Sequence, residues 1–174
     1  MGFSELNPGS LIVEIGVLHG LSTCFLGYGS KKSGAVLYAV DPFDSDFGRQ
    51  KEEFDGYVDH TQDKSSRNGV LRTLERGGLS DCVELVEGFS SEVAKEWNRE
   101  INFLWIDGNH RQFEQDYVSW RHFLVDGSRI AFHDSHPKYG FVETANYVKD
   151  VVANETVERL EQVKSITSFI IRNP

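Results

Sequence analysis

The sequence predicts an α/β fold built around a mostly parallel sheet, and two observations lead to this prediction. First, short apolar runs typical of strands buried on both faces alternate with segments of helical periodicity. Second, four of the apolar runs end in an acid: Glu14, Asp41, Asp107 and Asp134. Ligands of an open parallel sheet bind just outside the carboxyl ends of its strands. We therefore expect the four acids to line one edge of one crevice, which would suit a cation, a metal ion or sugar hydroxyls better than an unshielded phosphate.

Strands and helices are expected to alternate along the chain. The predicted strands are Leu11–Ile15, Val36–Val40, Val83–Val86, Ile101–Ile106, Ser128–Phe132, Val157–Val163 and Ile166–Arg172. The predicted helices are Leu21–Gly29, Asp63–Arg76, Ser90–Trp97, a helix with Phe113, Tyr117, Trp120 and Leu124 on one face, and Phe141–Val152. Pro42 ends the second strand because proline has no N–H for a central ladder. A tight turn joins the last two strands, so we expect them to be antiparallel.

Residues 43–62 are polar, aromatic and aperiodic. We expect them to form a long loop or a loose helix over the crevice, since such a loop in a compact domain is more often functional than idle. Its aromatic residues Phe43, Phe47 and Phe54 would form an apolar wall for a ligand or simply pack the loop down.

The composition indicates one domain spanning residues 1–174, which is an ordinary domain size. The net charge of −9 argues against binding to nucleic acid or to an anionic membrane, because both need a basic face. No apolar run approaches the roughly 18–20 residues of a membrane span, and no signal peptide is visible. Cys24 and Cys82 are far apart and in no metal-binding spacing, so we expect reduced thiols in a cytoplasmic protein.

The first strand leads into a loop that contains Gly16 and Gly20. Glycines here would let the backbone turn sharply and approach a ligand closely. Their spacing is neither the G-x-G-x-x-G of dinucleotide-binding loops nor that of a P-loop. The pair of glycines alone also fits a plain tight turn.

Asp41, at the tip of the second strand, is placed to accept hydrogen bonds from the hydroxyls of an adenosine ribose, although an aspartate before Pro42 also fits a turn or a helix cap. Glu14 beside the glycine loop helps to separate two classes of cofactor. A pyrophosphate avoids nearby carboxylates, whereas the sulfonium and the ammonium of S-adenosylmethionine are both positive. The sign of the charge therefore favours S-adenosylmethionine over a dinucleotide.

Asp107 and Asp134 follow strands that we expect to be neighbours, so their carboxylates could share one ion. Oxygen ligands fit Mg²⁺, and an imidazole from His133 would admit Mn²⁺ or another transition metal. The alternative is that the two carboxylates cap helices or bind loop amides. His110, three residues past Asp107, is a candidate base for a metal-polarised hydroxyl group, or else a solvent-facing residue of a first helical turn.

Five segments together resemble class I S-adenosylmethionine-dependent methyltransferases. They are EIGVLHGLST, LYAVDPFD, VELVEGFSSEVA, FLWIDGNH and IAFHDSHP, and the similarity extends over about residues 11–172. Within this class the chain resembles the metal-dependent O-methyltransferases that include macrocin-type and cephalosporin-hydroxylase-like sequences. The resemblance implies a doubly wound, Rossmann-like sheet of seven strands, mostly parallel, with an antiparallel pair at the C-terminus.

The resemblance also implies the residues of the site. It implies cofactor contacts at Gly16, Gly20, Asp41, Gly88, Phe89 and Ser90, with the adenine at the last three, a metal at Asp107 and Asp134, and His110 as the base. Two departures from the family pattern stand out. Leu18 occupies the place of a third loop glycine, and Asp134 is flanked by His133 and Ser135 where relatives often have a second acid or an amide.

The function expected from these observations is methyl transfer from S-adenosylmethionine to a hydroxyl group of a small-molecule acceptor, such as a sugar or a polyketide-type compound, assisted by a divalent metal ion. A chain that starts almost at its first strand is also expected to form a homodimer. Two alternatives stay open: a metal-independent methyltransferase, and a module that binds an adenosyl cofactor without catalysis. An NAD-linked enzyme is disfavoured by the glycine spacing and by the acid at position 14.

Overall fold

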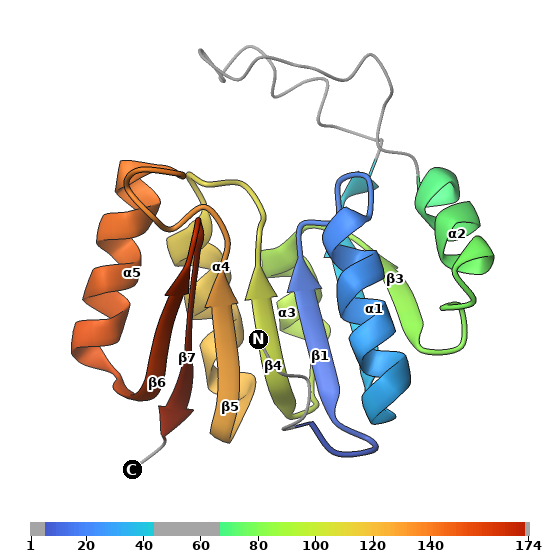
Figure 1. Ribbon diagram of the computed structural model, residues 1–174, viewed down its shortest axis with the longest axis horizontal. Helices are drawn as coiled ribbons and strands as arrows, with labels where there is room; N and C mark the ends of the chain where they lie inside the picture. The colour runs from blue at the N-terminus through green and yellow to red at the C-terminus, as the bar shows by residue number, and fades with distance from the viewer. Residues whose placement is uncertain (1–5, 44–66, 173–174) are drawn as a thin grey trace.

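The computed structural model describes residues 6–43 and 67–172, which form a seven-stranded sheet with helices on both faces (Figure 1). The strands are β1 (Leu11–Ile15), β2 (Val36–Asp41), β3 (Val83–Glu87), β4 (Ile101–Ile106), β5 (Leu124–Phe132), β6 (Thr156–Val163) and β7 (Ile166–Arg172). The helices are α1 (Leu21–Ser33), α2 (Arg67–Arg76), α3 (Ser90–Glu96), α4 (Phe113–Trp120) and α5 (Val142–Asn154), with a short 3₁₀ turn, η4, at Arg121–Phe123.

The sheet has the strand order β3-β2-β1-β4-β5-β7-β6. Strands β1 to β5 pair in parallel, and β7 is antiparallel to both β5 and β6. The order reverses at β1, whose neighbours are β2 on one side and β4 on the other, and such a switch point is where open α/β sheets bind ligands. The predicted fold class is therefore confirmed, including the antiparallel C-terminal pair.

Two apolar layers cover the sheet. One face packs on α1 and α2, through residues such as Leu26 and Leu74. The other face packs on α3, α4 and α5, and its largest fully buried side chain is Trp120. Because strand side chains alternate between faces, Ile12 and Glu14 belong to the α1 face, whereas the residues between and after them belong to the α4 face.

Two predicted boundaries were wrong. Leu124 is not on the helix with Trp120: α4 ends there, η4 follows, and Leu124 begins β5. The spacing of four residues fitted a helix because Leu124 fills the same core from a strand. The start of β5 was hidden by a polar stretch with Gly127, where the pairing with β4 shifts register. Helix α1 also runs past Gly29 to Ser33, and Gly34 in the left-handed conformation ends it.

Several expectations concern residues outside the described part of the chain, including the loop over residues 44–62, its Phe47 and Phe54, and the first turn of the predicted helix from Asp63. Phe43 is described and is buried in the α1-side core. Cys24 and Cys82 are both free thiols. Within residues 6–43 and 67–172, none of the helices has the length and apolar character that a membrane crossing requires.

An ion-pair network fastens the end of α4 to the end of α5. Arg121 donates two hydrogen bonds of 2.7 Å to the Glu155 carboxylate, and the Tyr117 hydroxyl donates a third. Both charged side chains are mostly buried, with 23% and 21% of their surface exposed. A paired, two-pronged contact of this kind is stronger than a surface ion pair.

We predict that Glu155→Gln lowers the free energy of unfolding by about 2 kcal/mol, because it removes the negative charge from the two-pronged contact between Glu155 and Arg121. Urea unfolding followed by circular dichroism measures the loss. Glu75→Gln, on the exposed side of α2, serves as the control and should cost less than about 0.5 kcal/mol. Equal unfolding midpoints for the two variants would contradict the assignment.

Candidate cofactor and metal site

The candidate site lies at the carboxyl edge of the central strands, where the parallel ladder continues past the ends of the strands. The Gly16 N–H bonds to the Val40 carbonyl at 3.0 Å, and the Asp107 N–H bonds to the Ile15 carbonyl at 2.8 Å. The His133 N–H bonds in the same way to the carbonyl at the end of β4, at 3.0 Å. These bonds keep the loops of β1, β4 and β5 in strand-like register for one more residue. The side chains of Asp107 and His133 are therefore held next to each other on the α1 face.

Gly16 lets the β1–α1 loop pass directly over Asp107. Its backbone is in the left-handed region, with φ at +88°. A Cβ atom at this position would come within 2.3 Å of the Asp107 carbonyl oxygen, so no other residue fits without moving the backbone. The glycine loop and the end of β4 are thus in contact, and a ligand on the loop lies beside Asp107. Gly20, the other glycine of the pair, sits at the N-cap of α1.

Asp41 holds the same loop from the β2 side. Its Oδ2 accepts hydrogen bonds from the backbone N–H groups of Val17 and Leu18, at 2.8 and 3.1 Å. Its Oδ1 accepts the N–H of Phe43 at 2.7 Å. A carboxylate has about four lone-pair sites, so about one remains for a ligand hydroxyl. The structure thus gives Asp41 the turn-stabilising role that was its alternative interpretation, and leaves limited room for the ribose role.

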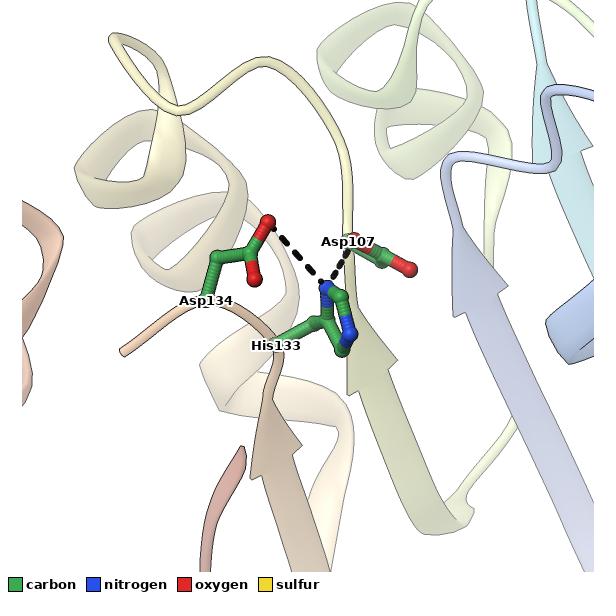
Figure 2. Close-up of side chains that lie close together, drawn as sticks. All are labelled: Asp107, His133 and Asp134. Carbon is green, nitrogen blue, oxygen red and sulfur yellow. Dashed lines mark ion pairs between the residues drawn. The ribbon is translucent and has the colours of Figure 1, made fainter. Parts of the chain in front are cut away.

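Three side chains converge at the ends of β4 and β5 (Figure 2). Asp107, His133 and Asp134 each offer one ligand atom, and these atoms all lie within 4.8 Å of one another. His133 Nδ1 is 2.9 Å from Asp107 Oδ1 and 3.4 Å from Asp134 Oδ2. Side chains this close together could hold one divalent cation among them.

The chemistry of this cluster fits a divalent cation. Two carboxylates and one imidazole are a ligand set that suits Mn²⁺ and related ions as well as Mg²⁺. His133 Nδ1 is buried and, although close to both carboxylates, makes no hydrogen bond of acceptable geometry. A cation bonded to Nδ1 would satisfy this atom. The cluster is partly exposed, with 22–32% of each side chain accessible, so an ion could enter.

The positive charge of protonated His133 can also offset the negative charges of Asp107 and Asp134. Asp107 and Asp134 raise the pKa of His133 to about 10, which makes it an imidazolium when no other cation is present. Burial acts to raise the pKa of Asp134, but the contacts with His110 and His133 outweigh it and hold this pKa well below its ordinary value. A metal bound through His133 Nδ1 must therefore displace the proton from that atom.

His110 points into the site and not into solvent. Its Nε2 lies 3.1 Å from Asp134 Oδ2. Its ring stacks on Phe113 with centroids 5.2 Å apart and packs on Phe141 at 4.0 Å. Two aromatic rings and one carboxylate thus hold the imidazole, which excludes the interpretation of His110 as a free surface residue. Phe141 was not predicted as a site residue, and its position before α5 gave no signal of this contact.

The conformation of the loop after β5 positions both Asp134 and Phe141. Asp134 adopts a left-handed backbone with φ of 49°, unusual for a residue other than glycine. Its carbonyl accepts the Phe141 N–H at 3.0 Å, and a Cβ on Gly140 would meet the same carbonyl oxygen at 2.1 Å. Ser135 anchors the loop through hydrogen bonds to Thr167 and to the Ser165 carbonyl. The backbone strain at Asp134 is thus supported from both sides, as is usual where a side chain must be aimed.

Glu14 departs most from expectation. It lies within β1, with none of its surface exposed, so it does not line an open edge. Neither carboxyl oxygen makes a hydrogen bond of acceptable geometry. Burial raises its pKa to about 8, the Ser22 and Thr23 hydroxyls oppose this shift, and the negative charges of Asp107 and Asp41 add to it. Glu14 is therefore an acid beneath the glycine loop that is protonated at neutral pH.

Phe89 and Ser90, the last two residues of the predicted turn from Gly88, line an open pocket of about 180 Å³ between the starts of α3 and α4. Phe89 is 43% exposed there. Asp116, which sequence reasoning missed, reaches this pocket from α4, and burial raises its pKa to about 6 against the opposing hydrogen bond from Ser90. The pocket combines an exposed aromatic ring with hydrogen-bonding groups, which is what a purine base requires.

His136 and His19 do not belong to the cluster. His136 lies in the loop after Asp134, where its Nδ1 accepts the Lys138 N–H and its ring packs on Tyr139. His19 is exposed in the β1–α1 loop. His60 lies outside the described residues.

Comparison of the sequence with models of protein families shows the family of the chain. The model of a methyltransferase domain family matches residues 13–135, from β1 to the residue after Asp134. The chain belongs to this methyltransferase family. The resemblance to class I S-adenosylmethionine-dependent methyltransferases is confirmed, while the metal-dependent branch stays a prediction.

Solved structures of other methyltransferases share the fold. The O-methyltransferase TomG from Streptomyces achromogenes, solved with S-adenosylmethionine, is 12% identical, with a TM-score of 0.67 over 94% of this chain and 73% of that one. An O-methyltransferase from Bacillus cereus with S-adenosylhomocysteine is 18% identical, with a TM-score of 0.63 over 92% and 73%. An rRNA methylase from Streptococcus thermophilus is 14% identical, with a TM-score of 0.64 over 98% and 92%. At these identities the matches show the methyltransferase fold and not the acceptor.

We predict that Glu14→Gln stabilises the protein at high pH but not at low pH. In the folded chain the pKa of Glu14 is raised from 4.5 to about 8, so the stability contributed by the neutral acid is fully present below pH 4.5 and is lost as the pH rises through 8. Glutamine stays neutral, and the gain in unfolding free energy at pH 9 should reach the order of 4 kcal/mol. Thermal unfolding at pH 5 and pH 9 measures it. Glu84→Gln, on an exposed position of β3, is the control, and a Glu14→Gln melting temperature that followed the wild type at both pH values would contradict the prediction.

Proposed function

We propose that this methyltransferase domain transfers a methyl group from S-adenosylmethionine to a hydroxyl group of a small molecule, assisted by a divalent cation. The observation that carries the proposal is the contact between the glycine loop and the carboxylate cluster. Gly16 passes over Asp107, so the residues suited to a cofactor and those suited to a cation border the same space. Two reactants held this close react as one molecule, which supplies much of the rate.

Different groups of residues would bind different parts of the cofactor. The loop from Gly16 to Gly20 and Asp41 would hold the cofactor's ribose and amino-acid end, and the pocket at Phe89, Ser90 and Asp116 would take its adenine. S-adenosylmethionine, when bound, supplies an electrophilic methyl group on a positive sulfur. The acidic rim formed by Asp107 and Asp134 is favourable for that charge.

Asp107, His133 and Asp134 would hold the cation, which when bound acts as a Lewis acid that lowers the pKa of a hydroxyl group. His110 would take the proton from the acceptor hydroxyl. Nε2 of His110 contacts the Asp134 carboxylate. When Nε2–H donates to that carboxylate, the other ring nitrogen, Nδ1, carries the lone pair that can accept a proton. Phe113 and Phe141 keep the ring in this orientation.

A small-molecule acceptor is supported by the O-methyltransferases among the similar structures and by the net charge of −9, which opposes binding to nucleic acid. We also propose that residues 1–174 act as one domain. The homodimer and the cytoplasmic location stay predictions.

A metal-independent methyltransferase is the second candidate, and one observation favours it. His133 already provides a positive charge between the two carboxylates, so the cluster does not need a metal ion to be stable. In that case His110 with Asp134 would act alone on the acceptor.

The proposed cofactor is tested by calorimetric titration with S-adenosylhomocysteine and, separately, with NAD. We expect S-adenosylhomocysteine to bind in the micromolar range and NAD to bind at least a hundredfold more weakly, because the pyrophosphate of NAD would be repelled by the carboxylates of Asp107 and Asp41. Equal affinities, or binding of NAD alone, would refute the assignment.

The proposed metal site is tested by titration with Mn²⁺ followed by electron paramagnetic resonance. Asp107→Asn and Asp134→Asn should each weaken Mn²⁺ binding at least tenfold while changing S-adenosylhomocysteine affinity by less than tenfold. His136→Gln, which removes an imidazole outside the cluster, is the matched control and should bind Mn²⁺ like the wild type. Unchanged Mn²⁺ binding in both aspartate variants would exclude the metal site, and full methyl transfer in the presence of a chelator would select the metal-independent mechanism.

A further inference from the structure

Helix α1, which lies in front of the sheet in Figure 1, carries more large apolar side chains on its outer side than on its inner side. Its exposed positions before Lys31 are Leu21, Phe25 and Tyr28, with 73%, 71% and 57% of their surface accessible. Its buried positions are mostly small or polar, and they are Thr23, Leu26, Gly27, Gly29 and Ser30. A helix at the surface of a globular protein ordinarily has the opposite arrangement, with its apolar side chains toward the core.

Helix α2 packs on the same face of the sheet and has the ordinary arrangement. Its buried residues are Val70 and Leu74, and its exposed residues are polar or charged, such as Arg72 and Glu75. The apolar outer side is therefore a property of α1 and not of this layer of helices. Its three exposed side chains follow one another at spacings of four and three residues, which places them in one row along the helix. We call this row, formed by Leu21, Phe25 and Tyr28, the α1 stripe.

The α1 stripe is large enough to form the centre of a protein interface. Its three side chains together expose roughly 400 Å², and monomeric proteins rarely expose apolar patches larger than a few hundred Å². Each partner of a stable interface buries about 800 Å², so the stripe would supply about half of that area, with polar residues around it as the rim. Aromatic residues such as Phe25 and Tyr28 are enriched at the centres of such interfaces.

The charges around the α1 stripe fit a second copy of this chain. The net charge of −9 makes two copies repel each other over most of their surface, and it also opposes binding to an anionic membrane. Residues 21–30 carry no charged side chain, and Lys31 and Lys32 follow them directly. Lys32 Nζ lies 4.8 Å from the centre of the Tyr28 ring, at the end of the stripe. Two copies can therefore approach each other along α1, where the two lysines at the rim attract an acidic partner.

We propose that the α1 stripe is the contact surface of a homodimer in which two α1 helices cross at Phe25. Phe25 lies near the midpoint of the stripe, so two helices that cross in opposite directions place Leu21 against the partner's Tyr28. The same contact is then made twice, as a twofold axis requires, and the two Phe25 rings meet at the axis. This surface is on the outer side of α1, and the inference does not depend on the proposed function.

Sedimentation velocity of the full chain at about 1–200 µM tests the dimer. We expect the wild type to dimerise with a dissociation constant in the micromolar range, because the stripe supplies about half the area of a standard interface. Phe25→Glu should raise this constant about thirtyfold or more, since two carboxylates would be buried against each other at the axis. Val118→Glu, on α4, is the matched control. It removes a side chain that is 63% exposed and adds the same charge, and it should dimerise like the wild type.

A mixture of two variants tests the crossing point. Phe25→Glu and Phe25→Lys should each be monomeric at concentrations where the wild type is dimeric. An equimolar mixture of the two should form a dimer that contains one copy of each chain, as native mass spectrometry would show, because opposite charges then meet at the axis. Recovery of the dimer also shows that both variants fold.

The opposite results are equally definite. A wild type that is monomeric at about 200 µM would overturn the proposal, and so would a wild-type dimer that Phe25→Glu leaves intact. A mixture of the two charged variants that stays monomeric would exclude a twofold crossing at Phe25. If the wild type is monomeric and sediments with phosphatidylcholine vesicles while Phe25→Glu does not, the stripe binds a membrane surface and the dimer is refuted.

Discussion

The candidate site depends on one constraint, the continuation of the parallel hydrogen-bond ladder for one residue beyond the ends of β1, β4 and β5. The bonds from Gly16, Asp107 and His133 to the preceding strand ends keep three loops in register. Because the side-chain period of a strand is two, this register decides that Asp107 and His133 share a face with Glu14. A loop that left the ladder one residue earlier would turn Asp107 toward the opposite layer of helices.

The same constraint creates an electrostatic problem, because it places the carboxyl groups of Glu14, Asp41, Asp107 and Asp134 near one another. The chain deals with each acid differently. Asp41 is stabilised by three backbone N–H groups, and the carboxylates of Asp107 and Asp134 have an imidazole between them. Glu14 has neither kind of partner and stays neutral by keeping its proton. Hydrogen bonding, ion pairing and protonation each lower the cost of keeping a carboxyl group out of water, and all three are used within one site.

The sequence was sufficient to predict the sheet, its parallel and antiparallel parts and the pairing of Asp107 with Asp134, because these follow from strand-length apolar runs and from the acids at their ends. The predicted strand Leu11–Ile15 already contained Glu14, but the sequence was not sufficient to predict that this acid is fully buried and does not line the open edge of the sheet. Phe141 was missed for a different reason. The contact between Phe141 and His110 depends on the left-handed backbone of Asp134 and on Gly140. The spacing of apolar residues in the sequence does not predict the conformation of such a loop. Local patterns thus predicted the elements, while the side-chain contacts between loops required the structure.

A buried acid without a partner works against folding, and this bears on why Glu14 is present. Glutamine has nearly the same shape, carries no charge and would remove the penalty that ionisation imposes at high pH. A valine or isoleucine would suit the surroundings better still, since the neighbours of Glu14 on this face include Ile12, Ala39 and Trp105. Functional sites commonly hold residues that cost stability, because the property needed for function is the one that folding disfavours.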